Sequence, residues 1–118
     1  MQLPKITAYL DFEKQLELTD FFNDLKAQII KDFNSIGLYP ELAETENPKD
    51  FYAELYRIIQ YLVEQRFGDF LNLLYRIDVP EQKIKQLIAQ ANEDVITPIT
   101  LLVLQREYQK IWLRKKYS

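Results

Sequence analysis

Large apolar residues recur in this sequence every three or four positions, over stretches bounded by proline, glycine and helix-capping residues. The first clear stretch predicts a helix over about 20–36, capped by Thr19. Gly37 follows where a helix often ends in a left-handed conformation, and Pro40 prevents the helix from continuing. The apolar stripe of this segment consists of Phe22, Leu25, Ile29, Phe33 and Ile36. The spacing therefore predicts an all-α fold.

The rest of the chain carries start signals for three more helices. Asn47 precedes a proline at the first position of a helix over 48–76, which is typical of a capped helix start. Further helices are predicted over 80–92 and 97–116, each beginning beside a proline. The sequence leaves open whether 48–76 is one helix or two, and Gly68 is the obvious place for a bend.

The first 18 residues have a different pattern. Ile6, Ala8, Leu10 and Phe12 alternate with more polar neighbours, which favours an extended conformation. An isolated hairpin is marginally stable in water, so we expect this segment to lie on the bundle or on a partner. The prediction is a single domain, with a four-helix bundle over 19–118 and a short amino-terminal arm over 1–18. A chain of 118 residues is long enough to bury its own core.

The composition removes most residues that perform chemistry. The chain has no cysteine, no histidine and two glycines. It therefore lacks the usual ligands of zinc, haem and iron–sulfur clusters and the commonest general base. Two glycines are also too few for a glycine-rich phosphate-binding loop. The adjacent acids Glu93 and Asp94 are interpreted as loop polarity. We predict no catalytic residue, no metal site and no cofactor, and we expect a protein without catalytic activity.

Charge and hydropathy bear on location and partners. The amino terminus has no apolar run of signal-peptide length, and the longest run, 101–104, is too short to span a bilayer. We therefore expect a cytoplasmic protein that does not enter membranes. Residues 105–118 carry five basic side chains and one acidic one, whereas 11–50 carry ten acidic and four basic ones. The basic end suits a helix carboxyl terminus, and its excess is too small to predict nucleic-acid binding.

Two arginines fall on predicted apolar faces. At 100° per residue, Arg66 lies in the middle of the apolar face of 48–76, and Arg106 lies similarly in 97–116. One interpretation is that both converge on a pocket and hold a carboxylate or phosphate. The favoured interpretation is internal ion pairing, because Asp69 follows Arg66 by three residues and Glu107, Asp78 or Glu64 can serve elsewhere.

Two surfaces are candidate partner interfaces. Tyr61, Gly68 and Tyr75 follow one ridge at seven-residue spacing, although scattered exposed tyrosines would look the same. The segment 97–116 also has a second apolar face, which predicts either a contact between chains or coverage by the arm through Leu10, Phe12 and Leu16. This second face consists of Leu101, Leu104, Tyr108, Ile111 and Trp112.

The sequence thus predicts a small intracellular protein-interaction or regulatory module, with a protein partner or a second copy of itself in a homodimer. The alternative is a helical domain, binding or enzymatic, that grips an anionic ligand through Arg66 and Arg106.

Overall fold

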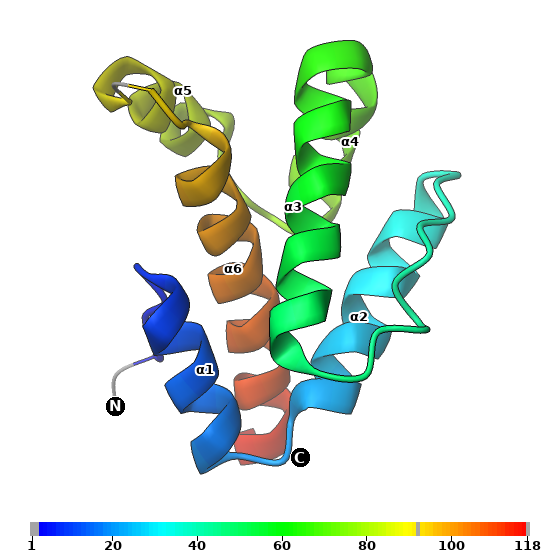
Figure 1. Cartoon of the computed structure of the whole chain (residues 1–118), viewed down its shortest axis with the longest axis vertical. Coiled ribbons are helices and arrows are strands. Elements are labelled where there is room, and N and C mark those ends of the chain that lie inside the picture. Colours follow the sequence, from blue (N-terminus) through cyan, green and yellow to red (C-terminus); the bar gives the residue numbers. More distant parts are fainter. Residues whose placement is uncertain (1–2, 92, 118) are drawn as a thin grey trace.

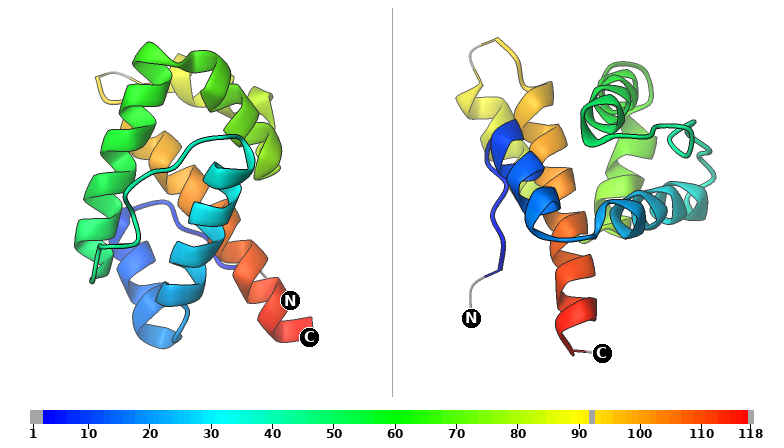
Figure 2. Two further views of the ribbon diagram at one scale, coloured as in Figure 1. Left: turned by 90° about the vertical axis from the view of Figure 1, so that its right-hand side faces the viewer. Right: turned by 60° about the horizontal axis from the view of Figure 1, so that its bottom comes forward.

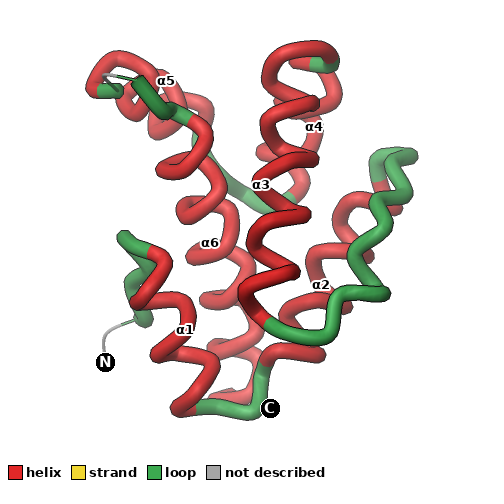
Figure 3. Tube along the Cα trace, in the orientation of Figure 1, coloured by secondary structure: helices red, strands yellow, loops and turns green. Residues whose placement is uncertain are grey.

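The computed structural model describes residues 3–91 and 93–117, and within these it contains six α-helices and no strand (Figures 1 and 3). The all-α prediction is confirmed, but six helices are present where four were predicted. Together they form one globule with a Cα radius of gyration of 13.6 Å. The helices are α1 (Tyr9–Leu18), α2 (Phe22–Ser35), α3 (Pro48–Gln65), α4 (Phe67–Arg76), α5 (Glu81–Gln90) and α6 (Ile96–Tyr117).

The longest helix, α6, is the centre of the arrangement. It packs against α1, α2, α3 and α5, and its carboxyl-terminal end projects from the body of the globule (Figure 2). This position explains why α6 is apolar on several sides: its buried residues face different neighbours. Among the described residues, no helix combines the length and apolarity that crossing a bilayer requires.

The predicted extended arm is wrong for residues 9–18, which form α1. The carboxylate of Asp11 accepts hydrogen bonds from the backbone N–H groups of Thr7 and Ala8, at 3.0 and 3.1 Å, and so stabilises the helix start. Phe12 and Leu16, one turn apart, are buried, whereas Leu10 is 65% exposed. The alternating pattern was misleading because it runs across the boundary between an extended stretch and a helix.

The segment 48–76 is two helices, and the break lies at Arg66 rather than at Gly68. Arg66 has φ −140° and ψ 55°, and it ends α3 and begins α4. A single helix of this length would measure about 43 Å, whereas the longest extent of the globule is 35 Å. The chain therefore turns, and α4 returns along α3 (Figure 1). This return buries Phe70, Leu73 and Leu74.

Local signals are confirmed at two other helix ends, but the predicted cap at Thr19 is wrong. The helix α2 begins at Phe22 after Phe21 and has no side-chain cap, and the Thr19 hydroxyl donates instead to the carbonyl of Gln15 at 2.8 Å. Gly37 has φ +82°, and the N–H of Leu38 donates to the carbonyl of Phe33 at 3.0 Å, which closes the end of α2. The Asn47 side chain accepts from the N–H of Asp50 at 2.9 Å and caps α3. The helix predicted from residue 80 ends at Gln90, and its predicted end, residue 92, lies outside the described residues.

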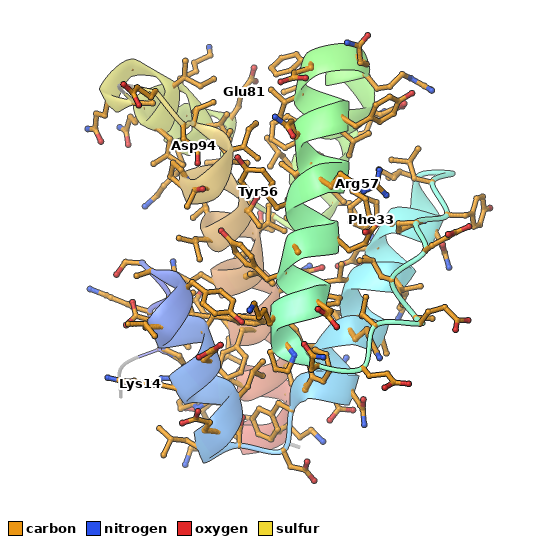
Figure 4. The ribbon with its side chains drawn as sticks, in the orientation of Figure 1. Lys14, Phe33, Tyr56, Arg57, Glu81 and Asp94 are labelled. Atoms are coloured by element: carbon orange, nitrogen blue, oxygen red, sulfur yellow. The ribbon has the colours of Figure 1, made fainter. Side chains whose placement is uncertain are left out.

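Asp94, interpreted above as loop polarity, has a structural role before α6. One of its oxygens accepts from the N–H groups of Ile96 and Thr97, at 2.9 and 3.1 Å. The same oxygen accepts from the hydroxyl of Tyr56 in α3 at 3.2 Å, and Figure 4 labels both residues of this contact. Asp94 therefore caps α6 and links its start to α3.

Candidate functional site

The two arginines form separate ion pairs. Arg66 lies at the corner between α3 and α4, where its side chain is 54% exposed and its Nη2 is 2.7 Å from Oδ2 of Asp69. Arg106 of α6 pairs with Asp78, with 3.0 Å between Nη2 and Oδ2. The pairing of Arg66 with Asp69 agrees with the favoured interpretation. The expectation that this ion pair lies inside the core is wrong. The helix break moves Arg66 to the surface, where an ion pair contributes little stability.

Two acidic side chains occupy the core instead. Asp32 of α2 and Glu107 of α6 are each 1% exposed. Asp32 accepts from the Gln28 amide at 3.1 Å and lies 3.3 Å from Arg76 Nε and 3.4 Å from Lys110 Nζ. Lys110 Nζ is also 3.2 Å from Oε1 of Glu107. The cluster joins α2, α4 and α6.

The two acids differ in protonation. Burial, reinforced by the hydrogen bond and the charge of Asp32, raises the pKa of Glu107 to about 9. Burial acts in the same direction on Asp32, but hydrogen bonds from Glu107 and Gln28 and the charge of Lys110 outweigh it and hold the pKa of Asp32 below its usual range. At neutral pH, Glu107 is therefore a neutral acid that donates to the Asp32 carboxylate. The core keeps one negative charge beside Lys110 and Arg76.

Sequence reasoning missed this pair, although a signal was present. Glu107 lies one turn from Val103 and one turn from Ile111, both of which are buried. Asp32 is 20° from Leu25 on a helical wheel of α2. Both acids thus lie on apolar faces. Because both carboxyl groups are almost fully covered, we interpret the pair as a structural contact between helices.

The second apolar face of α6 is core, so its predicted role as a partner interface is wrong for four residues: Leu101, Leu104, Tyr108 and Ile111 are all buried. The amino-terminal segment covers this face. The Tyr108 hydroxyl is 3.1 Å from Oγ1 of Thr19, and the N–H of Ile6 donates to Gln105 at 2.8 Å. Coverage by this segment was the stated alternative. It occurs through Phe12 and Leu16 but not through Leu10, which is exposed.

Trp112, the fifth residue of that face, is only partly buried. Lys116 Nζ lies 5.7 Å from the centroid of its ring, within the range of a cation–π contact. Trp112 therefore lies near the point where α6 leaves the core, with Lys116 of the same helix over its ring.

The other predicted ridge is exposed, although the break at Arg66 divides it between two helices. Tyr61 of α3 is 52% exposed, Gly68 is exposed, and Tyr75 of α4 is 88% exposed. On α4, Tyr75 continues a stripe of apolar residues spaced four apart. We call this stripe the α4 surface; it consists of Phe67, Leu71 and Tyr75.

Tyr75 stands between two hollows. The larger, of about 650 Å³, lies toward α5 and is lined by both apolar residues, such as Leu71 and Val79, and acidic ones. The smaller, of about 300 Å³, lies toward α2 and is lined by Ser35 and Arg76. The exposed ring is therefore a projection with a depression on either side.

In the part of the chain that the structure describes, no three acidic side chains gather in a way that could hold a metal ion. Comparisons of this chain with protein-family models, with curated proteins and with solved structures give no match.

Proposed function

We propose that this chain is a small intracellular protein-interaction module without catalytic activity, and that its partner binds the α4 surface. The observation that carries the proposal is Tyr75, which is 88% exposed and lies between two hollows. Tyrosine is enriched at interfaces and among the residues that dominate binding energy. Phe67, which is 45% exposed, and Leu71, which is partly buried, extend the same surface along α4.

The chemistry of the larger hollow indicates what a partner presents. Its lining combines apolar residues, among them Leu71 and Val79, with the acidic residues Asp78 and Glu81. The Asp78 side chain remains 81% exposed although it pairs with Arg106. We therefore expect a large apolar side chain of the partner to enter the hollow, with a lysine or arginine beside it. A second copy of the chain is one such partner.

The basic end of α6 supports a protein partner over a nucleic acid. Lys115 Nζ is 2.8 Å from Asp24, and Arg114 donates to Gln28 at 3.1 Å. Part of the basic charge is thus engaged with α2 of the same chain. A nucleic-acid interface instead requires a cluster of cations free to contact phosphates.

Photo-crosslinking in the native cell tests the proposal. A benzophenone amino acid at position 75 should give one specific adduct, with a partner or with a second copy. The same probe at Tyr39 is the matched control, because Tyr39 is 76% exposed but lies in the connector between α2 and α3. The double variant Phe67→Ala/Tyr75→Ala should lose the partner and keep its melting temperature. Absence of an adduct at position 75, or the same adduct from both positions, would contradict the proposal.

A further inference from the structure

A second depression lies between α5, α6 and the extended stretch that precedes α1. It consists of two hollows, of about 310 and 280 Å³, which share Lys83, Leu102 and Gln105 as lining residues. We call the pair the α5–α6 groove. We propose that this groove binds a small amphiphile with an aliphatic chain and a terminal carboxylate. The proposal does not rest on the α4 surface.

The first hollow suits the aliphatic chain. Its floor includes Ile6 and Leu101, which are 2% and 5% exposed, and its walls include the partly buried Leu87 and Leu102. The hollow is at the lower end of the range of about 300–1,000 Å³ that is typical of small-molecule sites. An unbranched chain would remove this apolar surface from water.

Long-range hydrogen bonds hold the third wall in place. The N–H of Ile6 donates to Oε1 of Gln105 at 2.8 Å, and Nε2 of Gln109 donates to the carbonyl of Pro4 at 2.8 Å. The amino-terminal stretch is therefore attached to α6 on one side of the groove. The site is formed before a ligand arrives, which lowers the cost of binding.

The second hollow suits the carboxylate. Arg106 and Asp78 both line it, with 3.0 Å between Nη2 and Oδ2, and the Asp78 side chain is 81% exposed, so a ligand carboxylate would share the guanidinium with Asp78 or replace it. Lys83, on the shared wall, forms no ion pair among the described residues. Two cations and one carboxylate leave a single positive charge, which matches a monoanionic carboxylate better than a dianionic phosphate.

Calorimetric titration with decanoate, decanol and decyl phosphate tests the assignment. The wild-type chain should bind decanoate at least about tenfold more tightly than decanol, because the head group adds charge-assisted hydrogen bonds. Lys83→Gln and Arg106→Gln should each weaken decanoate binding by about tenfold. Lys85→Gln, on an exposed position of α5 outside the groove, is the matched control and should bind as the wild type does.

Methyl NMR locates the site independently of any variant. Decanoate should shift the methyl signals of Ile6, Leu87 and Leu102 and leave those of Leu71 unchanged. Failure of the wild type to bind decanoate, or methyl shifts elsewhere, would overturn the proposal. Equal binding of decanol, tighter binding of decyl phosphate, or no effect of either groove variant would overturn the carboxylate assignment.

Discussion

Asp32 and Glu107 are acidic residues on predicted apolar faces that the fold keeps in its core. The sequence places two arginines and these two acids on apolar faces, yet only the acids are fully buried. Arg66 is exposed because the chain turns there, and Arg106 extends its long stem to the exposed carboxylate of Asp78. A carboxyl group on a short stem cannot extend in this way, so it must find a partner inside. A helical wheel does not distinguish a buried acid from an arginine whose charge reaches the surface. The prediction therefore named the arginines as the buried charges and missed the acids.

The acid pair predicts how stability depends on pH. Glu107 keeps its proton to about pH 9 when folded, whereas its ordinary pKa is 4.5. Between these values the folded state binds a proton that the unfolded state has lost, so the free energy of unfolding should fall as pH rises. The slope should reach about 1.4 kcal/mol per pH unit. Urea unfolding at several pH values between 5.5 and 8.5 measures it.

The chain is well suited to that measurement because it has no histidine to titrate in this range. Glu107→Gln should remove the slope, since an amide can donate to the Asp32 carboxylate at every pH. Glu64→Gln, at an exposed position, is the control and should keep the wild-type slope. Equal slopes in all three proteins would show that Glu107 is not the group responsible.

At the scale of elements, prediction succeeded at two helix ends where the signal was local, although the local signal at Thr19 failed. The end of α2 at Gly37 and the start of α3 at Asn47 depend on a few neighbouring residues, and both are confirmed. The break at Arg66 depends on the size of the globule, which the spacing of apolar residues does not encode. The helical state of α1 likewise depends on α6, because packing against α6 buries Phe12 and Leu16.

The two sides of α1 should therefore respond differently to substitution. Phe12→Ala should lower the free energy of unfolding by about 3–5 kcal/mol, because it leaves a cavity in the core. Leu10→Ala, two residues earlier and largely exposed, should change it by no more than about 0.5 kcal/mol. Urea unfolding followed by circular dichroism compares the two. Similar small effects of both substitutions would show that α1 does not pack in the core and would contradict this account.

At the scale of the whole molecule, one chain covers most of the apolar surface of the central helix, and Leu102 and Trp112 remain partly exposed. The second face of α6, which the sequence offered as a contact between chains, lies against the amino-terminal segment. The interaction candidate left by this arrangement is the α4 surface, at the edge of the globule. The spacing of residues selected Tyr75 of this surface but not Phe67 or Leu71, because which apolar residues stay exposed depends on which faces the fold itself uses.

The most direct test of this arrangement compares one glutamate substitution at each of the two surfaces. Tyr108→Glu should lower the free energy of unfolding by about 3 kcal/mol or more, because it places a charge in the core. Tyr75→Glu should change it by no more than about 0.5 kcal/mol. Urea unfolding together with sedimentation of both variants and the wild type gives the answer. A Tyr108→Glu chain that is as stable as the wild type but sediments as a smaller species would place this face between subunits and contradict the account.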